Sequence, residues 1–232
     1  WWLVFFLVLL LVAMLLLLAA RVLDPTAKWP PAWPAALVTT QGAKSDGAKP
    51  YIVTIPGYAP WLDEDFDGAS ANFGPSSVPG QLETIIMPES GVYRMQAWPE
   101  QMVWSLVDPS ALPAYRLETG ATVDATTPAG TTGLIGRFLD PGNFYLFEVD
   151  GSGAYRVELW REGQPFTLQA ATPSAIVMPA GQSNRLALED DGNRLRFYVN
   201  QALLFEVAAS QLPPGSAGIA VRAAGAEPAT GE

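Results

Sequence analysis

The chain has 232 residues, of which 49% are hydrophobic, and a formal net charge of −10. It contains no cysteine and no histidine, which excludes disulfides and any thiolate or imidazole acting as metal ligand, nucleophile or base. Residues 51–232 carry nine arginines, no lysine and 21 acidic residues, so this part of the chain would repel nucleic acid and anionic lipid.

The first 20 residues, WWLVFFLVLLLVAMLLLLAA, contain no charged residue and no proline. A helix of this length is roughly 30 Å long, which matches the hydrocarbon core of a bilayer. The sequence therefore predicts an uncleaved transmembrane anchor over residues 1–20, in contact with membrane lipid. A cleavable signal peptide is the alternative, because Ala19-Ala20 resembles a small-residue cleavage site.

Residues 21–50 contain five prolines and no sustained hydrophobic period. Such a composition favours an extended, semi-rigid connection, so we expect a Pro/Gly-rich linker here. Arg21 and Lys28 beside the anchor would by themselves favour a cytoplasmic position for the C-terminal part of the chain.

From residue 51 the pattern changes to short apolar runs separated by Gly, Pro, Asn and Asp. No later run of ten residues shows a helical period, and the spacing of the runs leaves no room for crossover helices. The sequence thus predicts an all-β, antiparallel two-sheet sandwich over residues 51–232. The expected strands are 51–55, 81–87, 92–97, 102–107, 115–125, 133–139, 144–149, 155–160, 166–170, 174–178, 184–189, 194–199, 202–207 and 218–222.

Alternation along two of these strands assigns their faces, since successive strand residues point to opposite sides. We expect the apolar set to be buried, namely Tyr155, Val157, Leu159, Leu195, Phe197 and Val199. The polar and aromatic set between them is expected to point outward, namely Arg156, Glu158, Trp160, Arg194, Arg196 and Tyr198.

Several motifs carry a resemblance to a known family. They are GLIGRFLDPGNFY (133–145), NRL (184–186), FYVN (197–200) and GSAGIAV (215–221), with EDFDGASANF (64–73) similar to an acidic opening strand. Together they resemble the concanavalin/laminin-G-type jelly roll, in particular bacterial extracytoplasmic domains related to the 3-keto-disaccharide hydrolase group. The resemblance implies a jelly roll outside the cytoplasm. Such folds host lectins, glycosidases and adhesion modules.

The chain departs from this family after its last motif. The family usually closes with a further strand, whereas residues 223–232 read AAGAEPATGE, with no apolar alternation. We expect either that this strand lies beyond residue 232 or that the sheet edge is open.

Jelly-roll glycosidases of the laminarinase type resemble one another in an E-x-D-x-x-E strand. The run FEVDGSG supplies Glu148 and Asp150, but Gly153 stands at the third position. A retaining mechanism needs two carboxyl groups, one of them able to protonate the leaving group. The sequence therefore predicts no catalytic residue, and Asp150-Gly151 is interpreted as a hairpin turn.

An acidic run offers a candidate calcium loop. Asp63, Asp65, Asp67 and Gly68 match the start of such a loop, but Gly74 stands where a bidentate glutamate is required. A solvated acidic strand and turn is the preferred interpretation, and no metal or cofactor is predicted.

Two aromatic residues lie on strand faces that are otherwise polar. Trp160 and Tyr198 could stack on a sugar ring while charged neighbours bond its hydroxyls, which predicts ligand-binding residues Trp160, Tyr198, Arg156, Glu158 and Arg196. The alternative is a solvated outer sheet joined by cross-strand Arg–Glu pairs. Trp61, Trp98 and Trp104 are expected in the core or at corners.

The sequence hence predicts a non-enzymatic module on the extracytoplasmic side of the bacterial cytoplasmic membrane, with a glycan or a protein as ligand. An alternative is a single-span accessory subunit of a respiratory or photosynthetic complex, its sandwich capping the outer face. A sugar hydrolase is implied by the resemblance alone.

Overall fold

The computed structural model describes residues 62, 64–68, 70, 73–78, 81–107, 111–127, 129–223 and 229–231. All of them belong to one compact unit. The expected anchor, the linker and the strand at 51–55 lie outside the described residues. Within the described residues, no helix is long and apolar enough to cross a membrane.

The described chain is an all-β sandwich of antiparallel strands, as the alternation predicted, and its one described helical element is the short η1 (Ala209–Gln211). The large sheet has six strands, in the order β4 (Met102–Leu106), β13 (Ser216–Arg222), β6 (Thr131–Asp140), β7 (Asn143–Asp150), β8 (Ala154–Arg161) and β9 (Gln164–Pro173).

Two further sheets have four strands each. The second sheet has the order β12 (Ala202–Ala208), β11 (Arg194–Val199), β10 (Ser183–Asp190) and β5 (Tyr115–Thr122). The third sheet has the order β1 (Ser76–Val78), β2 (Leu82–Met87), β3 (Val92–Ala97) and β14 (Ala229–Gly231).

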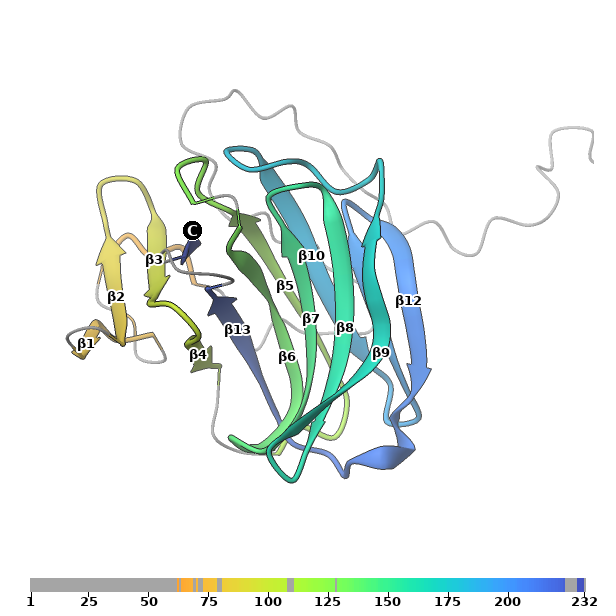
Figure 1. The fold of residues 1–232 in the computed structure, drawn as a ribbon. Coiled ribbons are helices and arrows are strands. Elements are labelled where there is room, and N and C mark those ends of the chain that lie inside the picture. Colours follow the sequence, from red (N-terminus) through yellow and green to blue (C-terminus); the bar gives the residue numbers. More distant parts are fainter. Residues whose placement is uncertain are drawn as a thin grey trace, which may run out of the picture. The chain divides into compact units, whose positions relative to one another are not determined.

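The expected two layers are present, but one of them is divided. A single bridge between Val123 and Gly231 links β14 of the third sheet to the end of β5 in the second. Ile219 of the large sheet packs against the core clusters under both smaller sheets, so both cover the same face of the large sheet. Figure 1 shows β6, β7 and β8 side by side, with β5 and β10 in the other layer.

The main core lies between the large and the second sheet, where the rings of Phe147 and Phe197 are 4.8 Å apart. The expectations for most alternating residues are confirmed, because Val157, Leu159, Leu195, Phe197 and Val199 are buried. Tyr155 is only half-buried; it packs against the main core, and its hydroxyl donates to the carbonyl of Leu204 in the second sheet at 3.3 Å.

The expected strand at 174–178 is wrong, because this segment is a loop. The amide of Val177 donates to the carbonyl of Ser174, which closes a turn, and Asn184 bonds the backbone of Met178 in both directions. The side chain of Asn184 thus takes the place of a neighbouring strand as hydrogen-bond partner for the backbone of Met178. The apolar run serves instead to insert Val177 into the main core.

The C-terminal segment also differs from expectation, because β14 pairs antiparallel with β3 and closes the third sheet. The strand is three residues long and is defined by its neighbours rather than by alternation. Gly231 packs closely on Val221: a Cβ at position 231 would lie 2.8 Å from the Cγ2 atom of Val221, so a larger residue would clash there. Near the other end, residues 64–68 are not in a strand, and the first described strand is β1.

Candidate functional site

The structure divides the five predicted ligand-binding residues between two faces. Arg156, Glu158 and Trp160 lie on the face of β8 that points away from the main core, in the large sheet. Arg196 and Tyr198 lie on the corresponding outer face of β11, in the second sheet. Because the main core separates these sheets, the five residues do not form one platform.

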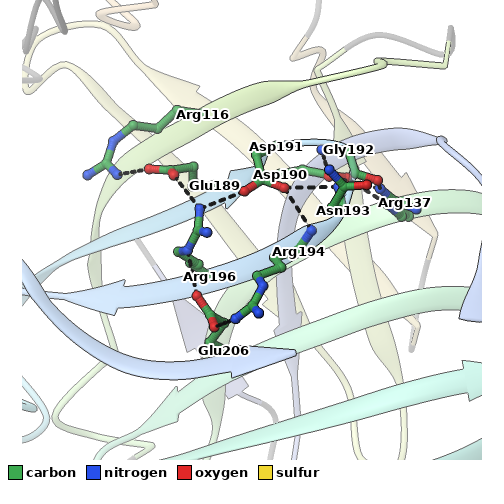
Figure 2. A network of polar contacts seen from close by, with 10 residues as sticks. All are labelled: Arg116, Arg137, Glu189, Asp190, Asp191, Gly192, Asn193, Arg194, Arg196 and Glu206. Carbon is green, nitrogen blue, oxygen red and sulfur yellow. Dashed lines mark hydrogen bonds and ion pairs between the residues drawn. The ribbon is translucent and has the colours of Figure 1, made fainter. Parts of the chain in front are cut away.

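The outer face of the second sheet carries a network of ion pairs (Figure 2). Arg196 bonds Glu189 at 2.9 Å, Asp191 at 2.9 Å and Glu206 at 2.6 Å. These carboxylates, Glu206 above all, raise the pKa of Arg196. This is the arrangement of cross-strand Arg–Glu pairs that the sequence left open as an alternative.

Tyr198 lies beside the same network of ion pairs. The guanidinium of Arg116 lies over its ring, 5.0 Å from the centroid, and also bonds Glu118 and Glu189. The ring face that a sugar would need on this side is therefore occupied by a cation.

The outer face of the large sheet carries a row of aromatic rings. Ring centroids are 5.8 Å apart for Trp104 and Phe138, 5.7 Å for Phe138 and Phe144, and 5.4 Å for Phe144 and Trp160. The last pair is stacked with an interplanar angle of 10°. Trp104, expected in the core or at a corner, lies half-buried at one end of this row, and Trp160 lies half-buried at the other.

A buried carboxylate lies beside this row, on the same face. Glu148 is directly opposite Arg156 across the β7–β8 ladder, and it is only 1% exposed. Its oxygens accept from Arg156 Nε at 2.6 Å, Arg222 Nε at 3.1 Å and Thr131 Oγ1 at 2.6 Å. Burial opposes its ionisation, but Arg222 and Arg156 outweigh burial and lower the pKa of Glu148.

The charge cluster is joined to the aromatic row by one glutamate. Oε2 of Glu158 lies 3.1 Å from Arg222 Nη2 and accepts from Trp160 Nε1 at 3.1 Å. Arg222 comes from β13, where it is opposite Thr131 of β6, and it reaches both glutamates across β6, in which Gly133 is opposite Glu148. Arg222, Glu158 and Trp160 thus form a chain of contacts from the charge cluster to the end of the row.

The other predicted sites can also be placed. Asp150 accepts from the amides of Ser152 and Ala154, so it holds the β7–β8 hairpin as interpreted from the sequence. Asp65 accepts from the amide of Asp67 at 3.3 Å, whereas Asp63 lies outside the described residues. Among the described residues, no group of three acidic side chains could hold a metal ion.

The sequence matches no protein-family model and no curated protein. Solved structures with the same fold do match. The carbohydrate-binding module CBM66 from Bacillus subtilis is 19% identical, with a TM-score of 0.53, over 71% of this chain and 95% of that one. The fold is concanavalin-like. A β-glucanase from Bacillus licheniformis is 10% identical over 72% of this chain and 92% of its own, with a TM-score of 0.48.

The concanavalin-like resemblance drawn from the sequence is thereby confirmed for the fold. At such identity the likeness says nothing of the ligand.

Sequence reasoning missed Phe144, Glu148 and Arg222 as members of one surface. A signal was available, because Phe144 and Leu146 alternate with the core residues Tyr145 and Phe147. Both faces of β7 are therefore apolar, which indicates that the outer face is not simply solvated.

Proposed function

We propose that this chain is a non-enzymatic glycan-binding module, held on the extracytoplasmic side of a bacterial cytoplasmic membrane by residues 1–20. The observation that carries the proposal is the outer face of the large sheet, where Trp160 and Trp104 lie in one row beside paired carboxylates and guanidiniums. Aromatic surface with a few convergent polar groups is typical of small-molecule sites.

The comparison with known folds supports the same function. CBM66, which shares the concanavalin-like fold, is a carbohydrate-binding module. Because one fold hosts many functions, this likeness adds weight to the surface argument and does not replace it.

The state of Glu148 supports a non-enzymatic module. A general acid in glycoside hydrolysis needs a raised pKa, whereas Arg222 and Arg156 lower the pKa of Glu148. Asp150, its neighbour in the near-miss motif, is engaged in a hairpin turn. We therefore expect no hydrolysis of laminarin, related β-glucans or 3-keto-glycosides.

A glycan array probed with the full-length chain in mild non-ionic detergent tests this function. We expect binding that is weakened by Trp160→Ala, since truncating a central aromatic commonly costs about 2 kcal/mol of binding energy. Tyr198→Ala is the competing variant on the opposite face. Loss of binding in Tyr198→Ala but not in Trp160→Ala would move the site to the second sheet, and no binding to any glycan would reject the proposal.

Two further measurements test the membrane part of the proposal. Mass spectrometry of the mature protein should find residues 1–20 attached, whereas an N-terminus near Arg21 would mean a cleaved signal peptide. Purification in mild detergent should yield the chain alone. Stoichiometric co-migration with other membrane proteins would instead favour an accessory subunit of a larger complex.

A further inference from the structure

The charges beside the aromatic row compensate one another within the site. The cluster has two carboxylates, Glu148 and Glu158, and two guanidiniums, Arg156 and Arg222. Arg222 contacts both carboxylates, and Arg156 contacts Glu148. The cluster therefore presents no net charge to a ligand.

Three nitrogens of the two guanidiniums already bond carboxylates within the cluster. Recognition of a carboxylate or sulfate group typically uses a guanidinium fork that offers two parallel N–H groups. Nε and Nη2 of Arg222 are taken up by Glu148, and Nη2 also lies 3.1 Å from Glu158. Nε of Arg156 is taken up by Glu148 as well. An anionic ligand that approached any of these three nitrogens would have to displace a carboxylate that is already in place.

The net charge of residues 51–232 also disfavours the binding of anionic ligands. Residues 51–232 carry 21 acidic residues against nine arginines and no lysine. A domain with this excess of negative charge repels polyanions before contact, most strongly at low ionic strength.

We infer that the outer face of the large sheet binds uncharged glycans and discriminates against glycans that carry carboxylate or sulfate groups. This inference rests on the proposed glycan-binding function. The rings of Trp160 and Trp104 would stack on the sugar, while the paired charges bond its hydroxyls without an ionic contribution. Arg222 is central to this property, because it contacts both Glu148 and Glu158 and, together with Arg156, balances their two negative charges.

The experiment uses an array on which each neutral oligosaccharide stands beside its sulfated or carboxylated form, probed with the full-length chain in non-ionic detergent. We expect neutral forms to bind at least about tenfold more tightly at low salt, because anionic forms are repelled by the negative excess of the domain and gain no compensating ion pair in a cluster without net charge. Equal or tighter binding of the anionic forms would overturn the inference while leaving the glycan-binding function standing. Absence of binding to both forms would reject that function itself.

A matched pair of variants separates the local charge cluster from the net charge of the chain. Glu158→Gln leaves an acceptor for Trp160 Nε1 and gives the cluster one net positive charge. Glu89→Gln removes one negative charge from an exposed turn between β2 and β3. We expect Glu158→Gln to narrow the preference for neutral forms several-fold at low salt, whereas Glu89→Gln leaves it unchanged. Equal effects in both variants would assign the selectivity to net charge alone and overturn the role of the cluster.

Arg222→Gln supplies the opposite change, because it leaves the cluster with one net negative charge. We expect this variant to bind anionic forms even less well than the wild type, provided that circular dichroism shows the β fold to be intact. Improved binding of anionic glycans by Arg222→Gln would contradict the inference.

Discussion

Arg137 and Asp190 form an ion pair inside the sandwich, with Nε 2.7 Å from Oδ2 and Nη2 2.9 Å from Oδ1. Their side chains are 3% and 0% exposed. The remaining guanidinium donors bond backbone carbonyls, Nη1 those of Ala209 and Leu212 and Nη2 that of Gly192. One side chain of β6 thereby holds the β10–β11 hairpin and the η1 segment. The arginine of the motif GRFLDPGNFY thus has a structural role.

The first prediction concerns this buried pair. Arg137→Gln should lower the free energy of unfolding by about 3–5 kcal/mol, because it leaves a buried carboxylate and three carbonyls without their cationic partner. Urea denaturation followed by circular dichroism measures the change. Arg194→Gln is the control, since Arg194 is largely exposed and should change stability by no more than about 0.5 kcal/mol. Similar losses of unfolding free energy in both variants would show that the buried Arg137–Asp190 pair stabilises the fold no more than an exposed ion pair does.

The second prediction rests on the lowered pKa of Glu148. A carboxylate with a lowered folded-state pKa contributes stability above its unfolded-state value, here 4.5, and that contribution is lost as the pH falls through the folded-state pKa. The wild type should therefore be more stable than Glu148→Gln near pH 7. The gap should shrink steadily below about pH 4.5, because the wild-type carboxylate becomes neutral as well.

Urea midpoints measured over this pH range check the second prediction. Glu89→Gln is a suitable comparison, because Glu89 lies in an exposed turn and its loss should give a small gap at every pH. A gap between wild type and Glu148→Gln that stays constant down to about pH 3 would contradict the linkage argument.

The third prediction concerns the stacking of Trp160 on Phe144. Outward alternation alone predicts that Trp160→Ala leaves the fold nearly intact, but the stacked contact with Phe144 changes this expectation. Trp160→Ala should cost about 2 kcal/mol of stability, from lost apolar burial and lost stacking. Trp160→Phe should recover most of this loss, because it keeps a ring against Phe144 but has no donor for Glu158. Thermal unfolding of the wild type, Trp160→Ala and Trp160→Phe measures these differences in stability. A Trp160→Ala variant as stable as the wild type would mean that the stacking of Trp160 on Phe144 contributes little to stability.

Much of the fold could be predicted from the sequence, because alternation is a local property of each strand. It correctly placed Val157 and Leu159 in the core, as well as Leu195, Phe197 and Val199. Alternation does not say to which sheet a strand belongs. For that reason Trp160 and Tyr198 could be placed outward correctly and still lie on opposite faces of the sandwich.

Other features depend on partners that are distant in the chain. Asp190 is 53 residues from Arg137, and Arg222 is 74 residues from Glu148, so no local pattern connects either pair. The strand β14 has only three residues, and its pairing depends on the free edge of β3. The charge cluster at the candidate site therefore became visible only when the strand order of the large sheet was known.

The last prediction concerns the glycine beneath the charge cluster. A Cβ at Gly133 would lie 2.0 Å from the carbonyl oxygen of Phe147 and 3.0 Å from the Cα of Glu148. Gly133→Ala should therefore force β6 and β7 apart and lower the free energy of unfolding by about 1–3 kcal/mol. Gly120→Ala is the matched control in β5, because its Cβ would meet nothing closer than the Ser183 hydroxyl at 3.7 Å.

The same pair of variants also reports on the candidate site. Because Gly133 is opposite Glu148 in the β6–β7 ladder, displacing β7 should loosen the contacts of Arg222 with Glu148 and, through Glu158, the position of Trp160. Gly133→Ala should thus weaken glycan binding even at temperatures where the protein remains folded, whereas Gly120→Ala should bind as the wild type does. If Gly133→Ala loses stability but binds glycan with unchanged affinity, then the contacts of Arg222 with Glu148 and Glu158 do not position Trp160 for binding.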